Sequence, residues 1–141
     1  MSRRGQARVE IRRVYDGPPE GGPHRVLIDR LWPRGIAKAD APFDEWAKEV
    51  APSTELRRWY GHDPAKFDEF ARRYRDELAL SPANDGLARL CVLAEKKGIV
   101  LVTATRDVEH SGAEVLLDVL VGRIDAETSR NSQFTPRLSG P

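Results

Sequence analysis

The sequence predicts an α/β fold: a single, small, three-layer domain whose mostly parallel, Rossmann-like sheet is flanked by helices. Two observations lead to this class. Short apolar runs that suit buried strands alternate with longer segments whose apolar residues recur at helical spacing. The chain also has 141 residues, 40% of them hydrophobic, which is the size and composition of one globular domain. We therefore expect one domain over residues 8–122, between a flexible N-terminus (1–7) and a flexible or peripheral C-terminal tail (123–141).

Three segments read as strands of this sheet. Residues 9–15 place Val9 and Ile11 on one face, as a half-buried strand does. Residues 25–29 and 99–102 are short apolar runs bounded by other structure, which is typical of fully buried strands. Helices between such strands imply a parallel sheet covered on both faces, although three strands are few for that architecture.

Five helices are expected in the remaining segments. Most carry an apolar stripe at spacings of three and four residues, the pattern of a helix with one buried face. Asp63-Pro64 is a helix start, with an acceptor at the N-cap and proline at the first helical position, and Gly61 marks the end of the helix before it. The expected helices cover residues 42–50, 53–60, 64–78, 82–97 and 112–121.

Cysteine content and hydropathy indicate a cytoplasmic protein. Cys91 is the single cysteine, so the chain cannot form an internal disulfide and nothing suggests secretion. The basic N-terminal residues are not followed by the apolar run of a signal peptide. No stretch approaches the length needed to span a bilayer, and we expect no membrane contact.

Charge and motifs narrow the function classes further. The formal net charge is +1, so the charge of the whole molecule does not argue for nucleic acid as a partner. The chain has neither a glycine-rich dinucleotide fingerprint nor a phosphate-loop lysine motif, and no cofactor is indicated. The three histidines and the single cysteine lack zinc spacing, so we expect no metal site. Any attraction for an anion must therefore come from a local cluster.

Polar side chains follow all three expected strands. In open α/β sheets, ligands bind at the carboxyl ends of the strands, which makes these exits the candidate site. The exits carry Tyr15 after the first strand, Asp29, Arg30, Trp32 and Arg34 after the second, and Arg106, Asp107 and His110 after the third. The prediction depends on the strand order, because the site exists only if the three exits lie at the same end of the sheet.

The residue types at these exits suggest an arginine-lined site for an anion. Pro33 and Gly35 should stiffen the loop that presents Arg34, and a restrained arginine loses little freedom on binding. Arg30, Arg34 and Arg106 are expected to hold the anion. Asp29 and Asp107 are candidates either to orient those arginines or to accept hydrogen bonds from ligand hydroxyls. The other candidates are Trp32 as a ligand contact, and Tyr15, His62 and His110 as groups for proton transfer.

Each of these residues also has a purely structural interpretation. Trp32 can fill the core, and the arginines can pair with Asp29 or Asp107, because structural ion pairs resemble sites. His110 can be a surface or capping residue near a helix start, and His62 can belong to a helix boundary. Both interpretations stay open at this point.

Long segments of the chain resemble a known family of bacterial proteins. Arg25-Val-Leu-Ile-Asp-Arg-Leu-Trp-Pro-Arg-Gly35 and Ala51-Pro-Ser-Thr-Glu-Leu-Arg-Arg-Trp-Tyr-Gly-His-Asp-Pro64 are similar to the signatures of the YeaO-like proteins, catalogued as domain of unknown function 488. The resemblance covers about residues 8 to 121. It implies an α/β fold, a short cytosolic protein and importance of the polar strand ends, but it supplies no substrate.

The third polar segment departs from the family pattern. The family tends to have an aromatic residue at the position of Thr103 and alanine at that of Thr105. After His110 it tends to have asparagine and a second histidine, where this chain has Ser111 and Gly112. A second histidine therefore has no counterpart here.

Two functional hypotheses follow from these patterns. The leading one is binding of a small anionic, phosphate-bearing and nucleotide-like ligand at the strand ends, with the question of catalysis open. The alternative is a non-catalytic interaction protein that binds a partner protein or nucleic acid through the same arginine-rich surface, with salt-sensitive affinity. The residues do not indicate the reaction or the oligomeric state.

Overall fold

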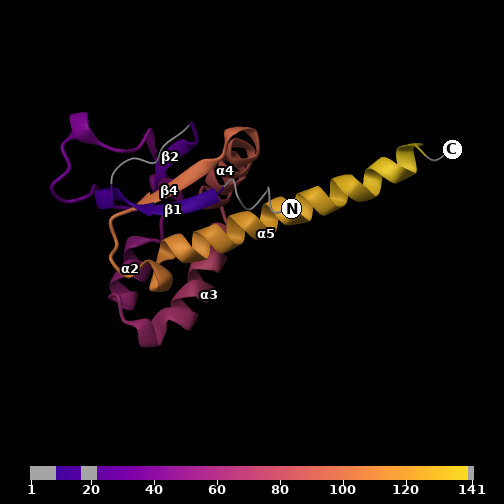
Figure 1. Cartoon of the computed structure of the whole chain (residues 1–141). Helices are drawn as coiled ribbons and strands as arrows, with labels where there is room; N and C mark the ends of the chain where they lie inside the picture. Colours follow the sequence, from indigo (N-terminus) through magenta and orange to yellow (C-terminus); the bar gives the residue numbers. More distant parts are fainter. Residues whose placement is uncertain (1–8, 17–21, 140–141) are drawn as a thin grey trace.

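The fold is built on a four-stranded parallel sheet. A computed structural model describes residues 9–16 and 22–139, with side chains described as far as residue 126 (Figure 1). The strands are β1 (Val9–Arg13), β2 (His24–Leu27), β3 (Glu45–Trp46) and β4 (Ile99–Thr103). Their order in the sheet is β1-β4-β2-β3, and every neighbouring pair is parallel. The predicted α/β class with a parallel sheet is confirmed.

The helix predicted over residues 42–50 is wrong. This segment forms strand β3 and then the short 3-10 helix η3 (Lys48–Val50). The Asp44 N–H donates to the Arg25 carbonyl over 2.8 Å, and the Ala47 N–H donates to the Leu27 carbonyl over 2.9 Å. The backbone is therefore committed to the edge of β2 and is not available for helical bonds.

The other helices begin close to where local signals place them, and all of them except α5 also end there. They are α2 (Thr54–Tyr60), α3 (Phe67–Leu78), α4 (Ala83–Lys97) and α5 (Gly112–Ser139). The Ser53 side chain accepts from the Leu56 N–H at the start of α2, and Gly61 ends that helix with a φ of 56°. Short 3-10 helices also occur in the connections: η1 (Val14–Asp16), η2 (Lys38–Asp40), η4 (Pro64–Lys66) and η5 (Val108–His110).

Helix α5 is longer than the sequence suggested. It was expected to end at Val121, but it continues to Ser139 and projects away from the rest of the molecule (Figure 1). Ile124, which we had assigned to the tail, is only 2% exposed and belongs to the main core cluster. The core therefore extends slightly beyond residue 122. The expected flexible N-terminus (1–7) lies outside the described residues.

The two faces of the sheet are covered differently. On one face, helices α2 to α5 contribute to a single large core cluster together with Val9, Val26 and Leu101. On the other, a smaller cluster centred on Leu27 and Val102 is covered by Ile36, Phe43 and Trp46 from the connection between β2 and η3. Within the described residues, the helices thus flank one face and a loop rich in aromatic residues covers the other.

Candidate functional site

The strand order brings the three polar exits to one edge of the sheet. Strand β4 lies between β1 and β2 and is parallel to both. Parallel neighbours end at the same edge, so the segments after these strands lie next to one another. The condition on which the predicted composite site depends is therefore met. We call this region the strand-exit edge; it comprises Arg13–Asp16, Asp29–Arg34 and Thr103–His110.

Asp29 joins the exit of β2 to that of β4. Its carboxylate accepts from the Thr103 hydroxyl over 2.7 Å and from the Ala104 backbone N–H over 2.8 Å. Burial raises the pKa of the Asp29 carboxyl, while these two hydrogen bonds and the positive charge of Arg57 act in the opposite direction. Asp29 is thus a mostly internal carboxylate that fixes two loops, with the guanidinium of Arg57 on α2 close enough to affect it.

A second set of contacts joins the exit of β1 to both of these loops. Arg13 Nε donates to the Thr105 carbonyl over 3.0 Å, and the Arg13 guanidinium lies 5.3 Å from the centre of the Tyr15 ring. The Tyr15 hydroxyl in turn donates to the Arg34 carbonyl over 2.9 Å. These contacts connect Arg34 to Thr105 through Tyr15 and Arg13. Arg106 follows Thr105 in the chain, so Arg34 and Arg106 belong to the same region of the strand-exit edge.

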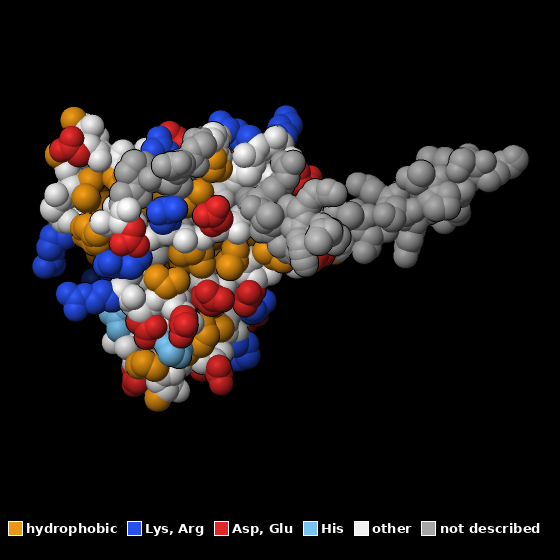
Figure 2. Space-filling view, viewed as in Figure 1, with side chains coloured by type: hydrophobic (Ala, Val, Ile, Leu, Met, Phe, Trp, Pro, Cys, Tyr) orange, Lys and Arg blue, Asp and Glu red, His pale blue; other side chains and the backbone are white. Residues whose placement is uncertain are grey.

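Arg34 and Arg106 present uncompensated charge at this edge. Both residues are exposed, and within the described part of the chain neither guanidinium has an ion pair or a hydrogen bond. Two of the nearby carboxylates have other partners, since Asp29 is bound internally and Asp107 contacts His110. Figure 2 shows Lys and Arg side chains gathered around a hollow on the left of the molecule, beyond the carboxyl ends of β1 and β4.

Arg30 and Trp32 are used inside the protein. Arg30 Nε donates to the Pro52 carbonyl over 2.9 Å, and its Nη2 donates to the Ala51 carbonyl over 3.2 Å. Trp32 Nε1 donates to the Ile36 carbonyl over 2.6 Å, and its ring packs edge-on against neighbouring aromatic rings. The structural interpretation that the sequence left open for these two residues fits their contacts.

The predicted histidines lie on either side of Tyr60. The Tyr60 hydroxyl donates to the His110 carbonyl over 2.5 Å, and His110 Nδ1 is 2.9 Å from Asp107 Oδ2. His62 is exposed, has a φ of 57°, and its ring centre is 6.4 Å from that of Tyr60. Burial raises the pKa of Tyr60, and the charges of Asp107 and Asp63 raise it further. Tyr60 is therefore a neutral anchor between the two histidines.

Sequence reasoning missed three residues that shape this region. Arg13 stands at the end of β1, so the rule that singled out the other strand exits could have found it. Tyr60 and Glu77 carry no such signal, because each acts on a segment far away in the sequence. Glu77 on α3 accepts from the Ser53 N–H over 2.8 Å and from the Ser53 hydroxyl over 2.6 Å, which fixes the start of α2.

The described residues have neither a metal-binding cluster nor a membrane-spanning helix. They contain no group of three or more His, Cys, Asp or Glu side chains arranged to hold a metal ion. Among the described helices, none has the length and apolar character needed to cross a membrane.

Comparison with known proteins assigns the family. Residues 8–138 match the family DUF488-N3i, described as the inactive DUF488-N3 subclade, and the chain belongs to this family. It is similar to the uncharacterised protein Rv3073c of Mycobacterium tuberculosis, with 50% identity over 119 residues, which cover 84% of this chain and 98% of the relative. The uncharacterised protein YeaO of Escherichia coli is 38% identical over 112 residues, which cover 79% of this chain and 96% of that relative. The resemblance to YeaO-like proteins is thus confirmed; no solved structure gave a match.

Proposed function

We propose that the protein binds a small anionic, phosphate-bearing ligand at the strand-exit edge. One observation carries this proposal: Arg34 and Arg106 are both exposed at the same edge of the sheet, and no described residue pairs with either guanidinium. Guanidinium groups form strong, often bidentate hydrogen bonds with phosphate oxygens. An arginine pair without internal partners can make these bonds without first breaking others.

The surroundings of the two arginines favour a restrained site. The Tyr15 hydroxyl holds the Arg34 backbone, and Asp29 holds the loop that leads to Arg106. A restrained arginine loses less conformational freedom when it binds, which favours affinity. The Tyr15 ring is 46% exposed and lies beside Arg34, so it offers a surface on which a nucleobase or another flat group can stack. The ligand class that fits both features is a nucleotide or a similar aryl phosphate.

The proposed role is binding without turnover. The family carries the description of an inactive subclade, which favours a binding role. The Tyr15 hydroxyl, one of the groups offered for proton transfer, already donates to a carbonyl. His62 is exposed, and its ring centre is 6.4 Å from that of Tyr60.

Substitution of both arginines tests the proposal directly. Titration with inorganic phosphate and with adenosine 5′-monophosphate, followed by NMR and by thermal shift, should show saturable binding to the native protein. Arg34→Ala and Arg106→Ala should each weaken binding by about tenfold to a hundredfold, since a hydrogen bond to a charged group contributes about 1.5–3 kcal/mol. Arg75→Ala, which removes an exposed arginine on α3, is the matched control and should leave affinity unchanged.

The outcome that contradicts the proposal is equally clear. If neither anion binds, or if both variants bind as the native protein does, the edge is not an anion site. A second candidate, binding of a partner protein or nucleic acid, is favoured by the exposure of Leu31 (59%) next to the basic side chains. That role predicts binding to a macromolecule that weakens steeply with salt, in the absence of any response to small anions.

A further inference from the structure

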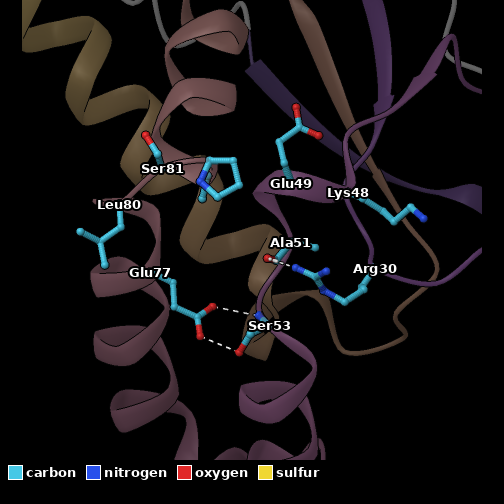
Figure 3. Close-up of a pocket in the computed structure, with 10 residues that line it drawn as sticks. Arg30, Lys48, Glu49, Ala51, Ser53, Glu77, Leu80 and Ser81 are labelled. Atoms are coloured by element: carbon cyan, nitrogen blue, oxygen red, sulfur yellow. Dashed lines mark hydrogen bonds between the residues drawn. The ribbon is translucent and has the colours of Figure 1, made fainter.

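A cavity of about 450 Å³ lies next to the strand-exit edge, shares Arg30 with it and is bordered by the segment that precedes α2 (Figure 3). One wall is formed by Ala51 and Ser53, and the opposite wall by the turn between α3 and α4, with Leu80 and Pro82. This volume lies within the range of small-molecule sites. The cavity involves neither Arg34 nor Arg106, so it is a separate place in the fold.

The walls are largely apolar, but charges of both signs face the space between them. Leu80 is 67% exposed, although a free leucine side chain prefers burial. Arg30 belongs to the loop after β2. Its Nε and Nη2 donate to two backbone carbonyls, while no described residue accepts from its Nη1. Lys48 also lines the cavity, but its ammonium group lies 4.4 Å from the centre of the Trp46 ring and points away (Figure 3).

Two carboxylates complete the lining. Glu77 is bound by the N–H and the hydroxyl of Ser53, which are neutral donors, so its negative charge is not cancelled by them. Glu49 is paired through Oε2 with Arg89 over 3.2 Å, and its carboxylate is directed away from Glu77 (Figure 3). Arg30 and Glu77 do not form an ion pair with each other among the described contacts. Both charges therefore remain available to a ligand.

We propose that this cavity binds a free α-amino acid with an aliphatic side chain. Its carboxylate would accept from Arg30, its ammonium group would donate to Glu77, and its side chain would cover Leu80 and Pro82. A ligand with a single charge fits less well, because it pairs with only one of Arg30 and Glu77 and leaves the other charge of the cavity without a partner. A zwitterion satisfies both signs at once, and the apolar turn provides the remaining contact area.

The experiment is an NMR titration of the full chain with L-leucine and two analogues. Leucinamide lacks the carboxylate, and 4-methylpentanoate lacks the ammonium group. L-Leucine should produce saturable shifts at the amides of Ser53, Leu80 and Ala83, with no change at Arg34 or Arg106. Each analogue should bind at least about tenfold more weakly, which corresponds to the loss of one charged contact. Absence of saturable shifts at the cavity, or equal affinity for the analogues, would overturn the proposal.

Two further variants preserve the hydrogen bonds of Arg30 to the Ala51 and Pro52 carbonyls. A change in their ligand binding can therefore be measured in a folded protein. Leu80→Trp should block the cavity and abolish binding, while Val92→Trp, at a 51% exposed position on α4, is the matched control. Glu49→Gln keeps the shape of the side chain but removes a charge that is directed away from Glu77, so it should leave leucine affinity unchanged and serves as a second control (Figure 3). Unchanged leucine affinity in a folded Leu80→Trp protein would show that the ligand does not occupy this cavity.

Discussion

Arg30 and Arg34 belong to the same loop but occupy opposite environments. Arg30 is half-buried and donates to the carbonyls of Ala51 and Pro52, so it connects the exit of β2 to the start of α2. Arg34 is exposed, its guanidinium has no described partner, and only its backbone is held, by Tyr15. The comparison teaches that arginine content does not define an anion site. What matters is whether the guanidinium is already engaged.

The largest expected effect comes from removing the engaged arginine. Arg30→Ala leaves the buried carbonyls of Ala51 and Pro52 without their donor, and each unsatisfied group costs about 1–3 kcal/mol. We expect the free energy of unfolding to fall by about 2–4 kcal/mol, measured by urea denaturation. Arg34→Ala should stay within about 0.5 kcal/mol of the native protein. Equal effects of the two substitutions would remove the distinction between these arginines.

Asp29 gives an effect of intermediate size that depends on pH. Burial raises the pKa of its carboxyl above the ordinary value of 3.8. A carboxyl with a raised pKa in the folded state contributes stability that is present below pH 3.8 and is lost as the pH rises through the folded-state pKa. Asn cannot ionise. The free energy of unfolding of Asp29→Asn should therefore rise, relative to that of the native protein, as the pH increases from 3.8 through the raised pKa of Asp29.

Urea denaturation at a series of pH values measures this difference for Asp29. The Asp44→Asn variant gives the opposite sign and serves as the control, because hydrogen bonding to Arg25 lowers the pKa of Asp44 to about 2. The stability from Asp44 is present above pH 3.8 and is lost as the pH falls towards about 2. A flat profile for Asp29→Asn would mean that burial does not govern this carboxyl.

The smallest effect is expected from the bond that restrains Arg34. Tyr15→Phe removes the hydroxyl that donates to the Arg34 carbonyl but keeps the ring. Because this bond is exposed, stability should change by less than about 0.5 kcal/mol. Phosphate affinity should fall by less than it does in Arg34→Ala, since only the restraint is lost. If titration with phosphate shows no change, the Tyr15 bond does not organise the site.

Local signals were sufficient for much of the helical structure. Ser53, Gly61 and Asp63 each bond within a few residues of themselves, so their roles as caps could be read from the sequence. The segment around Phe43 and Trp46 could not be read in this way. Its apolar spacing suits a helix, but the residues cover a face of the sheet, and the deciding bonds reach back to Arg25 and Leu27.

The candidate site was predictable in its parts and not in its arrangement. Polar residues after each strand were visible in the sequence, yet their convergence depends on β4 lying between β1 and β2, which no local pattern specifies. The hydrogen bond from Arg30 to the Ala51 carbonyl and the one from Tyr60 to the His110 carbonyl also join residues that are far apart in the chain. Such contacts are decided by tertiary packing and lie beyond the reach of local propensity.

The central position of β4 has a consequence for the order in which the protein is assembled. Val9 on β1 is paired with Ile99, and His24 on β2 has the same partner, so the first strand has no neighbour in the sheet until the fourth has been made. On the ribosome, the apolar residues of β1 therefore stay without a partner strand through most of synthesis, whereas β2 can pair earlier with β3. Protection of that nascent segment, by early helices or by a chaperone, becomes a requirement of this topology.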